Sequence, residues 1–256
     1  MDTDIALLAR LWRAWHVHGG ALSTVDWRRP TRCGDWTVAA LYAHVSQGVA
    51  GLDALLDRPA PEDAAAADAA PDVPSTAEFV GLPASRSRPA GPTVSAASTT
   101  ESLGVGPPVV DAAALLRRFH RDASAPAGPD NGLAAELAGR NSRRAVVDAG
   151  RSDPRELVAR FGDPAADVLS RAEPCLDVVV DYFGHGRVRI ADAVLIRIME
   201  ATVHLLDLDH ALGRAPSPTP DAVARSLGLL MAVPDQVHLL EAATGRHSDP
   251  VFPLLA

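Results

Sequence analysis

The sequence predicts a mainly α-helical protein, and three observations support this fold class. Apolar residues recur at helical spacing in several segments, the clearest being 5–18, 38–56, 111–121, 189–212 and 221–231. Capping residues stand at the ends of several of these segments. Runs of β-branched residues, which would indicate strands, are short. With 256 residues, 47% of them hydrophobic, the chain can form one large domain or two small ones.

Composition excludes some classes of partner. The net charge is -8 and no cluster of basic residues is present, which argues against a nucleic-acid partner. Cys33 and Cys175 are the only cysteines, so reduced thiols are expected. The N-terminus lacks the usual form of a signal peptide, and no apolar run reaches the length of a membrane span. We expect a soluble, cytoplasmic protein with no membrane partner, either a monomer or a homodimer.

The N-terminal part is expected to contain two helices. The first runs from Ile5 to His18 and ends near Gly19 and Gly20. A loop with proline and glycine follows, and either Asp35 or Thr37 can cap the second helix, 38–56. His44 lies on the apolar side of that helix, where a histidine can equally be a hydrogen-bonded core residue.

Residues 59–110 differ in composition from the rest of the chain. Nine of the 21 prolines stand between Pro59 and Pro108, among many alanine, serine and glycine residues. We interpret this part as a long irregular insertion. It is either inert or a flap over a functional site, since loops of this length are commonly one or the other.

The middle of the chain is less regular. Asp111 is a candidate N-cap for the helix that ends near Arg121, and residues 132–138 can form a short helix. Asp153 and Glu156 have the spacing of a capping box. Residues 145–148 and 176–183 are candidate strands, although the second can also be buried helix. Residues 184–187 form a predicted turn.

The segment 189–212 contains most of the candidate functional residues. Glu200 and His204 are four residues apart and therefore share a helix face, and Asp207 follows near the same face. The remaining residues are mostly apolar, so the helix should be buried, and a buried carboxylate is costly unless it is paired or binds a metal. The pair can be half of a metal site, a hydrogen-bonded core pair or an exposed contact. Gly213 is the expected C-cap.

Two motifs together resemble the DinB-like superfamily, and within it the mycothiol-dependent maleylpyruvate isomerase family. The first, PTRCGDWTVAALYAH, spans 30–44, and the second, RIMEATVHLLDLDHALG, spans 197–213. We expect residues 215–256 to form a helical or α+β C-terminal extension. The resemblance covers about residues 5–56 and 186–214 and implies a four-helix bundle, which we place at residues 1–214. It also implies one divalent metal ion, usually zinc, bound by His44, Glu200 and His204. Gly34 and Asp35 depart from the family's usual residues before Trp36.

The resemblance also implies a reaction. Three protein ligands leave a fourth position open on zinc, and a thiol that binds there loses its proton. Mycothiol would be the thiol co-substrate, in a transferase or isomerase acting on a small electrophile. Asp207 would hold the thiol or orient a ligand, or else be a solvated charge. Alternatives are a zinc-dependent hydrolase of the same fold, although the His-Glu-x-x-His signature is missing, and a non-catalytic metal-binding bundle.

The sequence does not name the substrate. A dicarboxylate would need cationic groups near the metal, and several arginines could supply them: Arg117, Arg118, Arg187, Arg189 and Arg197.

Overall fold

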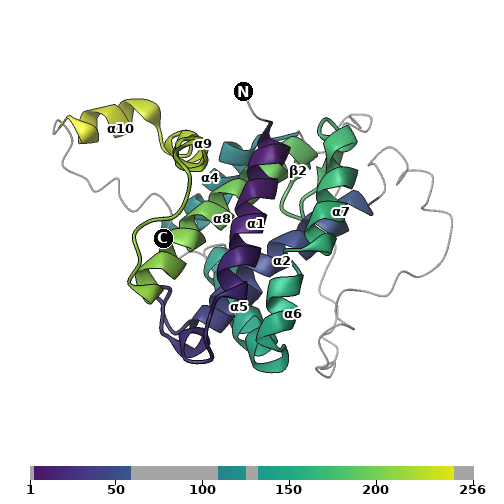
Figure 1. Cartoon of the computed structure of the whole chain (residues 1–256). Coiled ribbons are helices and arrows are strands. Elements are labelled where there is room, and N and C mark those ends of the chain that lie inside the picture. Colours follow the sequence, from purple (N-terminus) through teal and green to yellow (C-terminus); the bar gives the residue numbers. More distant parts are fainter. Residues whose placement is uncertain (1–2, 59–108, 125–131, 245–256) are drawn as a thin grey trace, which may run out of the picture.

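The computed structural model describes residues 3–58, 109–124 and 132–244 (Figure 1). The predicted insertion therefore lies almost wholly outside the described residues. The helices are α1 (Asp4–Gly20), α2 (Val38–Leu56), α4 (Ala112–Ser124), α5 (Gly132–Arg151), α6 (Pro154–Ala159), α7 (Asp163–Ala172), α8 (Ile190–Leu212), α9 (Pro220–Met231) and α10 (Gln236–Ala243). Two 3-10 turns cover Asp26–Arg28 and Glu173–Cys175, and the strands are β1 (Val179–Asp181) and β2 (Arg187–Arg189).

The four longest helices form the bundle, and the mainly α-helical fold class is confirmed. Helix α2 packs against both α5 and α8, while α1 packs against α8 (Figure 1). The short helices α6 and α7 cover α1 and α2, and α9 packs on α8. Among the described helices, none is long and apolar enough to cross a membrane. The central position of α2 and α8 matters because these two helices carry the predicted metal ligands.

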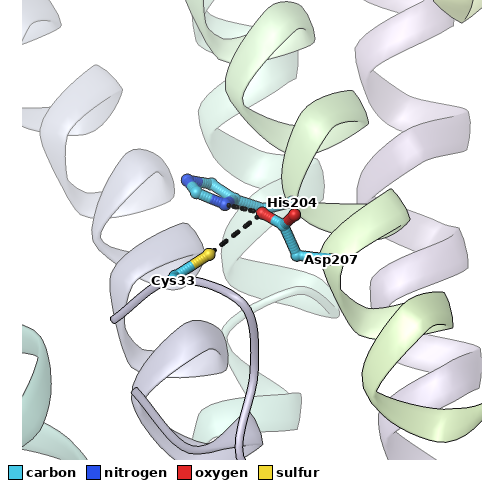
Figure 2. A group of neighbouring side chains, drawn as sticks. All are labelled: Cys33, His204 and Asp207. Carbon is cyan, nitrogen blue, oxygen red and sulfur yellow. Dashed lines mark hydrogen bonds and ion pairs between the residues drawn. The ribbon is translucent and has the colours of Figure 1, made fainter. Parts of the chain in front are cut away.

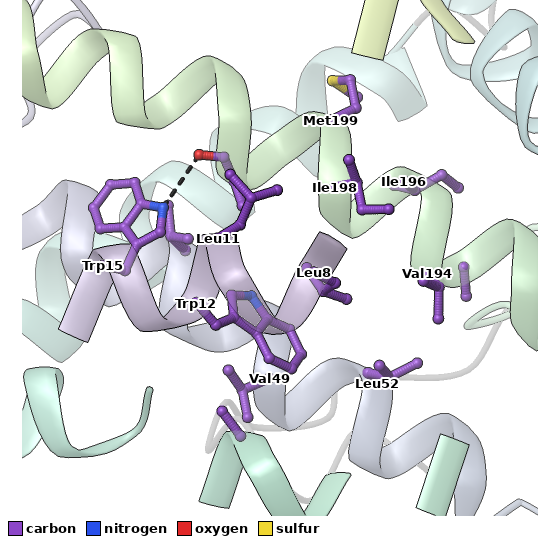
Figure 3. Packing of buried hydrophobic residues seen from close by; sticks show 14 of the residues in the cluster. Leu8, Leu11, Trp12, Trp15, Val49, Leu52, Val194, Ile196, Ile198 and Met199 are labelled. Carbon is purple, nitrogen blue, oxygen red and sulfur yellow. Dashed lines mark hydrogen bonds between the residues drawn. The ribbon is translucent and has the colours of Figure 1, made fainter. Parts of the chain in front are cut away.

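Two tryptophans of α1 anchor the core between α2 and α8 (Figure 3). Trp12 and Trp15 are almost completely buried. The indole Nε1 of Trp15 donates a hydrogen bond to the carbonyl oxygen of Ala201 at 3.1 Å. Tyr42 of α2 meets the Trp15 ring edge-on and donates its hydroxyl to the Trp15 carbonyl at 3.1 Å. These bonds fix the register of α8 directly beside Glu200, because a buried indole N–H needs a partner.

Most of the predicted helix ends are confirmed. Helix α2 covers the predicted range, and its N-cap is Thr37, whose hydroxyl accepts from Ala40 N at 3.4 Å. Asp111 caps α4 by accepting from Ala114 N at 2.6 Å. The capping box at Asp153 is present. Gly213 ends α8 in the left-handed conformation, with φ of 65°, which glycine adopts without steric cost.

The predicted strand at 145–148 is wrong, since these residues belong to the long helix α5. The predicted helix 132–138 is the beginning of the same element. Ala145 is buried, whereas Val146 and Val147 are 47% and 48% exposed. One small buried residue between exposed neighbours suits a helix that packs one face on α2. The two valines lower helix propensity only slightly, and packing decides the outcome.

The second candidate strand is confirmed in its centre. Only Val179–Asp181 is extended, and it pairs antiparallel with β2 in a register that places Val180 opposite Val188. The predicted turn at Gly184 joins the two strands, and helix α8 begins directly after β2. This small hairpin therefore leads the chain into the helix that carries Glu200.

Candidate metal centre

The three side chains implied as metal ligands lie together although they come from distant parts of the chain. His44 projects from α2, and Glu200 and His204 project from one face of α8. Glu200 Oε2 lies 3.4 Å from His44 Nε2 and 3.5 Å from His204 Nε2. The two imidazole rings have their centroids 5.0 Å apart, at 88° to each other. Two ring nitrogens and one carboxylate oxygen are therefore close together.

The spacing of these atoms fits a shared ion. A charge-assisted N–H···O⁻ hydrogen bond is usually about 2.7–2.9 Å long, so both contacts to Glu200 are long for hydrogen bonds. Two ligand atoms that each lie about 2.0–2.1 Å from a tetrahedral zinc ion are roughly 3.4 Å apart. The two observed separations, 3.4 and 3.5 Å, therefore have the length of tetrahedral edges. The donor set and these two separations fit zinc, and the ligand atoms of all three residues lie within 4.8 Å of one another.

Trp36 packs against both histidines. Its ring centroid is 4.8 Å from that of His44 and 6.0 Å from that of His204. Its indole Nε1 donates to Ser142 Oγ of α5 at 2.8 Å. The loop before α2 is thereby held over the imidazoles. Among the described residues, His44 Nδ1 is buried without a hydrogen-bond partner, so packing rather than a second hydrogen bond orients this ring.

Asp207 holds the other side of His204 (Figure 2). Its Oδ2 lies 2.8 Å from His204 Nδ1 and accepts from the Cys33 thiol at 3.1 Å. Its Oδ1 accepts from Arg32 Nε at 2.5 Å. The Asp207 side chain is only 7% exposed, and both of its oxygens are engaged by other side chains. Asp207 is therefore placed to orient His204.

The electrostatics of the cluster follow from these contacts. Burial alone would raise the pKa of Glu200, but hydrogen bonds with His204 and His44 hold it well below the usual value. Burial alone would lower the pKa of His204, but hydrogen bonds with Asp207, Cys33 and Glu200 raise it well above the usual value. Burial alone would raise the pKa of Asp207, but hydrogen bonds with His204, Arg32 and Cys33 outweigh this effect and lower the pKa to about 2. Without an ion, these interactions favour the charged form of both carboxyl groups and the protonated form of His204.

A second group of possible ligands, Cys33, His204 and Asp207, overlaps the first and shares His204 with it. The geometry distinguishes the two groups. The 2.8 Å contact between His204 Nδ1 and Asp207 is a normal hydrogen bond and is shorter than a tetrahedral edge. Histidines that bind metals commonly donate their other ring nitrogen to a carboxylate. An ion between His204, Glu200 and His44 would bind Nε2 of His204 and leave Nδ1 to donate to Asp207, so both ring nitrogens would have a partner.

Sequence reasoning missed Cys33 and Arg32 as neighbours of the site. The sequence indicated Cys33 only as one of two isolated thiols and predicted no role for Arg32. They stand 174 and 175 residues from Asp207, and the residues alone carry no signal that pairs them. The single hint was their position inside the first motif, just before Trp36.

Fold and side chains together define a class of protein: a helical bundle in which two histidines and a glutamate, residue types that can bind a metal, lie together between two central helices. Residues 8–113 match the family described as the mycothiol maleylpyruvate isomerase N-terminal domain. Over these residues, the match confirms the family resemblance that the first motif carries. The matched region contains His44 and ends before α8, so Glu200 and His204 lie outside it. Comparisons with curated proteins and with solved structures gave no match.

Proposed function

We propose that the protein is a divalent-metal-dependent enzyme that activates mycothiol for transfer to, or isomerisation of, a small electrophilic substrate. The observation that carries this proposal is the separation of Glu200 from His44 and from His204, which in both cases has the length of a tetrahedral edge. The family match over residues 8–113 supports mycothiol as the thiol. Zinc is the proposed ion because two imidazoles and a carboxylate are ligands that it favours.

Each residue of the cluster has a role in this proposal. His44, Glu200 and His204 would hold the ion, which supplies a deprotonated thiol at neutral pH. Asp207 fixes the tautomer of His204, so that Nδ1 donates to the carboxylate and Nε2 keeps its lone pair. Arg32 and Cys33 hold Asp207 in position. Trp36 shields the imidazoles from water.

The same site can serve a transferase or an isomerase. A thiolate that adds to an activated double bond allows rotation about the resulting single bond. If the thiol then leaves, the product is an isomer; if the adduct is kept, the reaction is a transfer. A cytoplasmic location suits both, because small-thiol chemistry and two free cysteines, Cys33 and Cys175, fit a reducing compartment.

The first experiment tests the ion site. Protein purified without chelator is expected to contain about one equivalent of zinc or a similar ion by elemental analysis. His44→Ala and His204→Ala should lose it, because two protein ligands hold zinc weakly. His210→Ala is the matched control, since His210 is exposed on the same helix. If His44→Ala and His204→Ala retain as much metal as the control, the site is wrong.

The second experiment tests the reaction. The metal-loaded protein is incubated with mycothiol and a series of electrophiles, and mass spectrometry detects thiol adducts or isomerised product. Turnover that requires both the thiol and His204 supports the proposal. Thiol-independent hydrolysis would favour a zinc-dependent hydrolase. Full metal content without turnover of any kind would favour a non-catalytic metal-binding bundle.

A further inference from the structure

A cavity of about 400 Å³ lies where α2, α5 and the end of α6 meet. Its polar lining consists of Ser46 and Gln47 of α2, Arg144, Asp148 and Arg151 of α5, and Arg160, which follows α6. Pockets for small ligands usually measure about 300–1,000 Å³, so this volume suits a small organic molecule.

The cavity and the candidate metal centre lie on different sides of α2. Ser46 and Ala50 line the cavity, whereas Gly48, midway between them in the sequence, faces Arg197 of α8. Residues two positions apart on a helix point about 200° away from each other. The candidate metal centre is on the α8 side of α2, so the cavity is a separate site.

A hydrogen-bonded ion pair forms one wall of the cavity. Arg160 donates to the two carboxylate oxygens of Asp148 at 2.7 and 3.0 Å, and to the hydroxyls of Ser46 and Ser152 at 3.1 and 3.0 Å. The charges of Arg160 and Asp148 balance each other, and these bonds fix the guanidinium. The pair therefore gives the cavity a rigid polar wall without a net charge.

Arg144 and Arg151 add two positive charges that this pair does not balance. They stand four residues before and three residues after Asp148, so all three share one face of α5. Both arginines are exposed, and in the described part of the chain no carboxylate forms an ion pair with either of them. Gln47 Nε2 is buried near Asp148 and has no hydrogen-bond partner of normal geometry among the described residues. The cavity thus offers two cations and a further donor to a ligand.

We propose that this cavity binds a small phosphate monoester, with Arg144 and Arg151 holding the phosphate group. A phosphate monoester carries a charge of about −1.5 to −2 at pH 7 and has three terminal oxygens, which suits two guanidinium groups. A carboxylate has one charge and two oxygens and would leave one arginine without an anion. The two arginines are about 10.5 Å apart along the helix axis, and their long side chains can meet at one phosphate group.

The volume of the cavity requires an organic part in the ligand. At about 30 Å³ for each oxygen-sized group, a phosphate group alone would fill less than half of the space. The rest of the ligand would lie against Ala50 and Val147, which contribute the apolar lining. This inference does not depend on the proposed function, because the residues that carry it are not those of the metal centre.

The test measures binding by calorimetry in a phosphate-free buffer of low, constant ionic strength. Glycerol 3-phosphate and ribose 5-phosphate are the probes, inorganic phosphate lacks the organic part, and glycerol lacks the charge. Wild type should bind at least one of the two esters saturably, with about one equivalent per chain. It should bind inorganic phosphate more weakly and glycerol not at all.

Three arginine variants and one alanine variant locate the site. Arg144→Gln and Arg151→Gln should each weaken ester binding at least about tenfold, because each removes charge-assisted hydrogen bonds. Arg143→Gln is the matched control, since it removes the same charge from α5 at a position that does not line the cavity, and it should bind as wild type does. Ala50→Phe places a ring in the cavity at an exposed position, so it should weaken binding while metal content is unchanged.

Several outcomes would overturn the inference. These are no saturable binding of either ester, binding of inorganic phosphate as tight as that of the esters, and an equal loss of binding in Arg143→Gln, which would indicate general charge attraction. Loss of ester binding in His204→Ala would also overturn it, because the ion and not the arginines would then hold the phosphate. Ester binding that needs Arg144 and Arg151 and persists in His204→Ala would support the site, even if the proposed thiol chemistry fails.

Discussion

Replacing Asp207 by asparagine tests how the second carboxylate acts on the centre. Asparagine has nearly the same shape and keeps one oxygen that can accept from His204, but it carries no charge. A hydrogen bond to a charged group contributes about 1.5–3 kcal/mol, against roughly 0.5–1.5 kcal/mol for a neutral pair. Loss of a carboxylate behind a metal-binding histidine typically weakens metal affinity about 10- to 100-fold. We expect Asp207→Asn to weaken zinc binding by such a factor at pH 8.

The size of this effect should depend on pH. Burial works against it, but Asp207, Cys33 and Glu200 together raise the pKa of His204 well above its usual value in the metal-free protein. Zinc must displace that proton, so wild-type affinity falls as the pH drops below the raised pKa. Asp207 itself stays charged over this range, because its pKa is about 2. Asp207→Asn removes one of the groups that raise the pKa of His204, so protons compete less with zinc for His204 in this variant. The difference between the two proteins should therefore narrow as the pH falls.

The assay is a competition for zinc between the protein and a chromogenic chelator, repeated between pH 6 and 8.5. Asp53→Asn is the control, because it removes a carboxylate of α2 that pairs with Arg171. An Asp207→Asn protein that binds zinc as tightly as the control at pH 8 would refute the reasoning. So would a difference that widens toward acid pH.

Two further predictions concern stability, and urea denaturation measures both. Gly19→Ala should destabilise the fold by about 1–3 kcal/mol, because the new Cβ would lie 2.5 Å from Val158 Cγ2 and 2.9 Å from Tyr42 Cε1; no loss of stability would mean that these contacts can relax. Asp148→Asn should cost about 1 kcal/mol at pH 7, because Arg160 lowers the pKa of Asp148 through a hydrogen-bonded ion pair. A carboxyl group whose pKa is lower in the folded than in the unfolded state stabilises the fold above its unfolded-state pKa. The difference in the free energy of unfolding between wild type and Asp148→Asn should therefore disappear as the pH falls below about 3.8. A difference that stays constant with pH would contradict this.

The sequence predicted the helices well where hydrophobic spacing and caps agree. Helix α2 has both an apolar face and the Thr37 cap, and its predicted ends are those observed. Residues 145–148 were misassigned because two adjacent valines resemble a strand locally. Their helical conformation depends on packing of Ala145 against the bundle, which a local pattern does not contain.

The site was predictable only in part. The motifs placed His44, Glu200 and His204 together, and the structure brings them together, while their role as ligands stays a prediction. The network around Asp207 and the support of Trp36 by Ser142 join residues more than a hundred positions apart. Such contacts arise from the way the helices cross, and spacing along the chain cannot reveal them.

The position of the centre has a consequence for the lifetime of the protein. His44 and Glu200 are separated by 156 residues, so an ion shared by them would fasten the two ends of a very long loop. A ligand that binds only the folded chain stabilises it by about 4 kcal/mol when present at a thousand times its dissociation constant. If the proposed ion is zinc, the zinc supply would then determine how much of the chain stays folded, and a shortage of zinc would lower the amount of folded protein.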